Sequence, residues 1–153
     1  MIELLFAVIK VVGYAAALTG AGVCLSQATV FRTLMLPAAL IALVRTAGAA
    51  LALAAVCSAL IYVLRLGSGF DSAAVDAVLG SSLGISLACQ CLGGLWLLCV
   101  MPGSAAYLAV VPILMAYAVV GHSATHGLLS SFTVLLHVAA VAWWAGGLWI
   151  LLH

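Results

Sequence analysis

The residues best suited to chemistry in this chain are histidines near its C-terminal end. His122 and His126 lie in the segment 121–127, and His137 lies in the apolar run that follows. The chain of 153 residues contains only four Lys and Arg and three Asp and Glu, so few other side chains could bind a metal or move a proton. Because an imidazole inside a bilayer is costly without a partner, an intramembrane histidine indicates a functional site.

The chemistry that these residues favour is copper binding. Imidazole binds copper, zinc and iron, and monovalent copper accepts a few soft or borderline ligands. His122 and His137 are the main candidate ligands, with His126 and Met115 as further ones. His137 should lie roughly 10 Å below the start of its helix, at the depth of Met115. We therefore expect the glycine-flanked loop 121–127 to dip into the bundle if His122 and His137 share a site.

The helix that carries His137 offers a face of small and hydroxyl side chains. Residues spaced by three, four or seven positions share a helix face, and the face of His137 includes Ser130, Thr133, Ala140 and Trp144. A face toward lipid would be rich in Leu and Phe, so we expect this one to look into the bundle. Near the end of the same helix, Gly146-Gly147 predicts a close approach of a second helix.

The composition predicts the environment of these residues. Hydrophobic residues make up 69% of the chain and charged residues 5%, with a mean hydropathy of +1.45, whereas soluble domains have about 25% charged residues. The apolar runs have the length of membrane-spanning helices, about 20 residues. We predict an all-α, polytopic integral membrane helical bundle in a single transmembrane domain, 1–153. Nucleic-acid binding is excluded because basic residues do not cluster.

Turn signals divide the chain into about five transmembrane helices, which places the termini on opposite sides of the membrane. Pro37 should begin the second helix, with the residues up to Arg45 as an interfacial lead-in. Asp71 suits the N-cap of the third helix, and Pro112 should kink the fourth. The expected spans are 4–31, 46–64, 72–100, 105–120 and 130–152.

Neither catalysis nor a disulfide framework is indicated. The chain lacks the common nucleophile, zinc-protease and phosphate-loop motifs, and three acids do not provide paired carboxylates, so we predict that it is not an enzyme. Its five cysteines lie in apolar segments, which favours buried free thiols. Cys89 and Cys91 point about 200° apart on a helix, so they do not converge on one ion.

Two short motifs carry a resemblance to a known family. Gly121-His122-Ser123-Ala124 ends one span, and His137 in the next is followed by Trp144-Ala145-Gly146-Gly147-Leu148. This pattern resembles the C-terminal signature of the CopD family of copper-resistance inner-membrane proteins. The resemblance implies a multi-pass protein of the bacterial inner membrane that transports periplasmic copper or delivers it to a copper enzyme, with His122 and His137 as the positions that carry over.

The resemblance also implies partners. The expected ligand is a copper ion, and the helices are expected to contact the lipid bilayer. A periplasmic copper-binding protein is a candidate protein partner. Members of the family are longer and have more spans, so this chain is expected to act as a single-module version, as a homodimer, or as a protein that no longer transports.

Two alternatives remain open from the residues. A b-type haem electron carrier would also use intramembrane histidines, but it needs two of them facing each other at similar depth. A structural or assembly subunit without a metal would need none of them.

Overall fold

The computed structural model describes residues 2–66, 71–99, 105–120 and 127–153, and these form helices without any strand. This confirms the predicted all-α bundle. The elements are α1 (Ile2–Thr29), α2 (Ala38–Arg65), α3 (Ser72–Leu79), α4 (Ser82–Cys99), the 3₁₀ helix η1 (Ala106–Ala109), α5 (Val110–Ala118) and α7 (Leu128–Leu151). Among these, α1, α2, α4 and α7 are long and apolar enough to cross a membrane. The expected fifth span, η1 and α5, is shorter.

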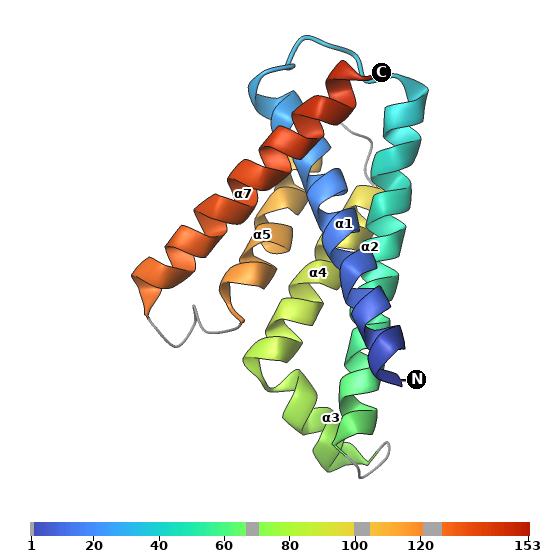
Figure 1. Ribbon diagram of the computed structural model, residues 1–153, viewed down its shortest axis with the longest axis vertical. Helices are drawn as coiled ribbons and strands as arrows, with labels where there is room; N and C mark the ends of the chain where they lie inside the picture. The colour runs from blue at the N-terminus through green and yellow to red at the C-terminus, as the bar shows by residue number, and fades with distance from the viewer. Residues whose placement is uncertain (1, 67–70, 100–104, 121–126) are drawn as a thin grey trace.

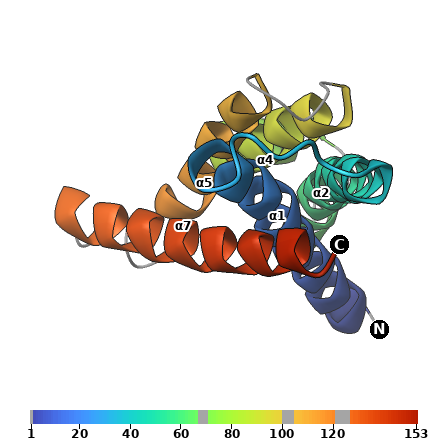
Figure 2. The ribbon, with the colours of Figure 1, turned by 90° about the horizontal axis from the view of Figure 1, so that it is seen from above.

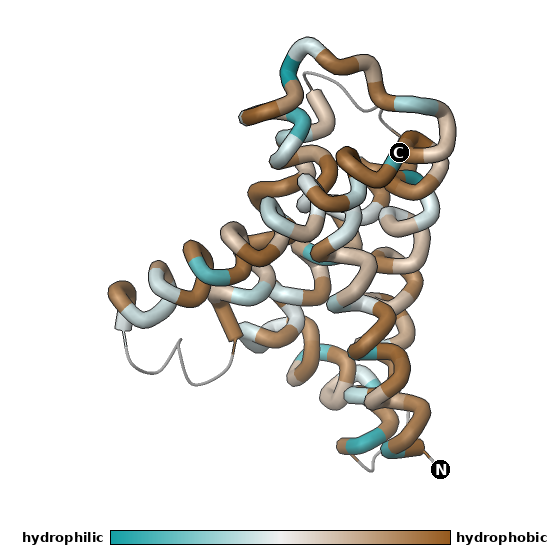
Figure 3. The backbone as a smooth tube through the Cα atoms, turned by 45° about the horizontal axis from the view of Figure 1, so that its top comes forward, coloured by the Kyte–Doolittle hydropathy of each residue, from teal (hydrophilic) through white to brown (hydrophobic). Residues whose placement is uncertain are grey.

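The helices run up and down through the molecule, with the chain termini near opposite ends (Figure 1). Helix α1 packs against both α7 and α2, α2 packs against α4, and α4 packs against α5. Helix α7 lies along one side, and its N-terminal half extends beyond the other helices when seen from above (Figure 2). Along the backbone tube, hydrophobic residues are frequent in every long helix and hydrophilic ones are scattered (Figure 3). Many large hydrophobic side chains are exposed, among them Leu4, Leu53 and Leu92, as expected where lipid surrounds the helices.

Glycine allows α1 and α7 to touch at the level of their backbones. Gly22 and Gly146 face each other so closely that a Cβ on either one would overlap the other helix's main chain. Two hydrogen bonds reinforce the crossing: the Ser26 hydroxyl donates to the carbonyl of Trp143, and the Trp143 indole donates to the Thr29 hydroxyl over 2.8 Å. The predicted close approach at Gly146-Gly147 is confirmed, and Gly146 is the residue that makes it.

A second glycine pair joins α2 and α4. A Cβ on Gly48 would lie 2.6 Å from the carbonyl oxygen of Gly94, and a Cβ on Gly94 would lie 2.6 Å from that of Gly48. Lipid tails are as apolar as the helix surfaces, so close van der Waals contact rather than the hydrophobic effect holds such helices together. These two crossings therefore fix how α7 packs against α1 and how α4 packs against α2.

The single helix expected over 72–100 is wrong, because the structure breaks it at Gly80 and Ser81. Asp71 caps α3 as predicted, accepting a hydrogen bond from the Ala74 amide over 2.7 Å. The Ser81 hydroxyl then accepts from the amide of Gly84 over 3.2 Å, which is the bond of an N-cap serine. Gly80 followed by serine is thus the start signal of α4.

Pro112 lies elsewhere in its helix than the middle position that was expected. Pro112 is the third residue of α5, and the 3₁₀ turn η1 precedes that helix. Amides in the first turn of an α-helix have no partner within the helix, so a proline there costs no hydrogen bond. Pro112 therefore lies at the beginning of the α-helix rather than bending its middle.

The other expected boundaries agree within a few residues. Pro37 is the N-cap residue of α2, and the helix continues without interruption past Arg45, which is half-buried. With 28 residues, α2 is about 42 Å long, so the turns before Arg45 can lie at the interface while the remainder spans. At the other end of α2, Arg65 pairs with Glu3 of α1 and lies 4.4 Å from the centre of the Phe6 ring.

Replacing Gly146 by alanine is expected to destabilise the protein. The added Cβ overlaps the backbone of Gly22, so α1 and α7 must separate, at a cost of about 1–3 kcal/mol. The free energy of unfolding can be measured in detergent micelles by titration with sodium dodecyl sulfate, followed by circular dichroism.

Gly147→Ala is the matched control, because a Cβ there lies 3.8 Å from the Ser26 hydroxyl oxygen, an ordinary contact. We expect a change within about 0.5 kcal/mol for this variant. Equal losses of stability in the two variants would contradict the proposed role of the crossing.

Candidate functional site

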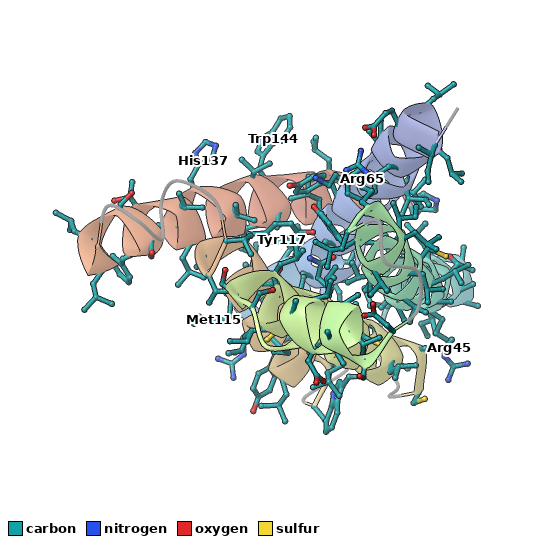
Figure 4. All side chains as sticks on the ribbon, turned by 90° about the horizontal axis from the view of Figure 1, so that it is seen from below. Arg45, Arg65, Met115, Tyr117, His137 and Trp144 are labelled. Carbon is teal, nitrogen blue, oxygen red and sulfur yellow. The ribbon has the colours of Figure 1, made fainter. Side chains whose placement is uncertain are left out.

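His137 points away from the bundle. Its side chain is exposed, as are those of Thr133, Ala140 and Trp144 on the same face. Figure 4 shows His137 and Trp144 projecting from the side of α7 that faces away from the other helices. The expectation that this face looks into the bundle is therefore wrong. The buried residues of α7 are instead Ala142, Gly146 and Ile150.

The crossing at Gly146 explains this orientation. His137 precedes Gly146 by nine residues, which is a rotation of about 180° on an ideal helix. Since Gly146 must face α1, His137 must face the opposite direction. The position of the glycine pair therefore indicates which face of α7 turns toward the bundle better than the small and hydroxyl side chains around His137 do.

Met115 does not join His137 within one chain. Its side chain is 41% exposed on α5, and in Figure 4 helix α7 lies between it and His137. His122 and His126 lie outside the described residues, so their approach to His137 stays a prediction. Within the described ranges, no three His, Cys, Asp or Glu side chains group as metal ligands.

The His137 imidazole makes no hydrogen bond to another described residue. It lies nine residues after the first residue of α7, about 14 Å along the helix, and therefore well inside the span. By contrast, His153 at the end of α7 packs its ring 5.9 Å from that of Trp149. An imidazole at the depth of His137 needs a partner, which must come from elsewhere than the described part of the chain.

All five cysteines are free, as predicted. Cys24 is buried in the core, whereas Cys99 is exposed, so the expectation of buried thiols holds only in part. Cys89 and Cys91 both lie on the continuous helix α4. Their opposed directions on that helix keep them from forming a two-thiol site within the chain.

The structure also has a cavity with several polar side chains in its wall, which the sequence reasoning missed. Helices α1, α2, α4 and α5 enclose it, and Lys10, Ser86, Gln90 and Tyr117 are among its lining residues. Ser86 donates to the carbonyl of Ala116 over 2.7 Å and accepts from the Gln90 amide over 3.2 Å. The sequence does contain one sign of this polar wall. Ser86 and Gln90 are four residues apart in an apolar helix, and such a pair forms one polar face.

Comparison with models of protein families, with curated proteins and with solved structures gives no match to this chain.

The two polar positions should respond differently to mutation. Ser86→Ala is expected to lower the free energy of unfolding by about 0.6–1.7 kcal/mol, because it removes a buried hydrogen bond between two membrane helices. His137→Leu should change it by less than about 0.5 kcal/mol, since this exposed imidazole has no partner among the described residues. Unfolding in detergent without metal checks both values, and a large loss in His137→Leu would show that the imidazole is a packing group.

Proposed function

We propose that this protein is a copper-handling protein of the bacterial inner membrane, in which His137 binds monovalent copper together with His122 and His126. The observation that carries the proposal is the exposed position of His137 inside the span, without a hydrogen bond to the described residues. A neutral imidazole is a good ligand for copper, and an ion would supply the partner that its position requires.

The motif around His137 supports the same proposal. The Gly146 position of the motif has a structural role, because it makes the backbone contact with Gly22. That contact turns His137 to the outer side of α7 and away from Met115. Met115 is accordingly not part of the proposed ligand set within one chain, and the remaining ligands come from the segment 121–127.

Delivery suits this geometry better than conduction through the bundle. His137 lies on the outer wall of the helix that extends furthest from the others. A ligand on an outer wall is accessible to a second copy of the chain or to a partner protein. We therefore propose that copper is bound at this wall and passed on within the bilayer to a homodimer partner, and that a periplasmic copper-binding protein exchanges copper at the end of the site formed by the segment 121–127.

A competition titration tests this proposal. Wild type in detergent is titrated with Cu(I) in the presence of a chromophoric chelator, in parallel with His122→Ala and His137→Ala. We expect one bound ion per chain or per dimer, and at least about a hundredfold weaker binding in both variants, which corresponds to about 2.7 kcal/mol.

His153→Ala is the matched control. His153 is 16 positions after His137 in the sequence, about 24 Å along the helix, so its loss should leave copper affinity unchanged. Failure of the wild type to take copper from a weak chelator would reject the proposal and favour a metal-free assembly subunit. A coloured preparation with a haem absorption band would favour the haem alternative.

A further inference from the structure

A cavity of about 410 Å³ lies between α1, α2, α4 and α5 and is open on one side. Its volume is within the range of about 300–1,000 Å³ that small-molecule sites have. Apolar residues such as Ile9, Leu83 and Leu87 form part of its wall. The remainder of the wall is unusually polar for the interior of a membrane bundle.

Several hydroxyl groups on this wall have no hydrogen-bond partner in the described part of the chain. Ser58 is buried at 6% exposure, and its hydroxyl makes no hydrogen bond to a described residue. Tyr14 and Tyr117 stack with their ring centres 5.2 Å apart, and Tyr62 contacts the ring of Phe6 edge-on. These tyrosines make ring contacts only, so their hydroxyls are available to a ligand in the cavity.

The charge of the cavity is positive. Lys10 is the only charged residue among the lining residues. The nearby carboxylate, Glu3, pairs with Arg65 instead. Among the described residues, the Lys10 ammonium contacts only aromatic rings, at 4.4 Å from the centre of Phe6 and 5.8 Å from that of Tyr62. Lys10 is exposed at the edge of the cavity, and a cation there without a protein counter-charge attracts an anion.

We propose that this cavity binds an oxyanion, a phosphate or carboxylate group, which pairs with Lys10 and accepts hydrogen bonds from Ser58 and the tyrosine hydroxyls. Charge-assisted hydrogen bonds of this kind are about twice as strong as neutral ones. A metal ion would be repelled by Lys10 and would find no carboxylate on the wall. A neutral ligand would leave the ammonium without a counter-charge. Of the proposed copper ligands, His137 is the one that the structure describes, and it does not line this cavity.

The position of Lys10 is consistent with the headgroup of an anionic amphiphile. Lys10 is eight residues after the beginning of α1, about 12 Å along a helix that is itself about 42 Å long and so extends beyond a hydrocarbon layer of about 30 Å. A lysine near the end of such a helix reaches the headgroup level along its flexible side chain. The apolar part of the wall could then hold carbon chains. A soluble phosphate that enters from the same side has the same chemistry, and the experiment separates these two sources.

The test uses the full chain in a neutral detergent after removal of lipid. In the first arm, phosphatidylglycerol or phosphatidylcholine with identical acyl chains is added back, and retained lipid is counted by native mass spectrometry. In the second arm, inorganic phosphate is added and the melting temperature is measured. Wild type is compared with Lys10→Met, Lys10→Arg and Tyr117→Phe, and Arg32→Met is the control because Arg32 does not line the cavity.

We expect one tightly held phosphatidylglycerol per wild-type chain, with affinity at least about tenfold lower in Lys10→Met. Lys10→Arg and Arg32→Met should bind like wild type, and Tyr117→Phe should bind several-fold more weakly. Stabilisation by inorganic phosphate that depends on Lys10, without selection of phosphatidylglycerol, would identify a soluble oxyanion. Absence of both effects in wild type, or equal losses in Lys10→Met and Arg32→Met, would overturn the proposal. Unchanged affinity in a folded Lys10→Met variant would overturn it as well.

Discussion

The arrangement of this bundle depends on backbone contact between pairs of glycines. Gly22 meets Gly146 where α1 crosses α7, and Gly48 meets Gly94 where α2 crosses α4. Inside a bilayer the hydrophobic effect does not distinguish helix from lipid, so only close packing and hydrogen bonds can select one helix arrangement. A side chain as small as a methyl group at these positions would separate the helices. The polar bonds around Ser26 and Trp143 act at the same crossing and orient the two helices.

This constraint also decides where the polar residues lie. Because Gly146 is turned toward α1, the opposite side of α7 carries His137 and Trp144 outward. The other end of α1, with Lys10 and Tyr14, lines a cavity shared with α2, α4 and α5. His137 thus lies outside the cavity that Lys10 lines, and the two proposed sites use different chemistry. One offers an imidazole to a cation, and the other offers an ammonium and hydroxyls to an anion.

Hydropathy and turn residues predicted the helical class, the span boundaries near Pro37 and Asp71, and the close approach at Gly146. Helix boundaries and kinks were predicted wrongly where one residue type can have two structural roles. Pro112 can kink a helix or begin one, and Ser81 can continue a helix or cap the next, and hydropathy does not distinguish these cases. The rotation of α7 was predictable in principle, because Gly146 and His137 are half a turn apart in phase. For the cavity, only the polar face formed by Ser86 and Gln90 was predictable. Its full lining was not, because it comes from four helices whose relative positions the sequence does not state.

The unequal lengths of the helices have a consequence for the membrane itself. With 28 residues each, α1 and α2 are about 42 Å long, whereas the hydrocarbon layer is about 30 Å thick. The segment of η1 and α5, with four and nine residues, is only about 20 Å long, and Val111 on it is 61% exposed. The apolar surface that contacts lipid is therefore long beside α1 and α2 and short beside α5. A span this short is accommodated by local thinning of the bilayer or by association with another apolar helix, so changes in lipid thickness should act on this protein mainly at the flank beside α5.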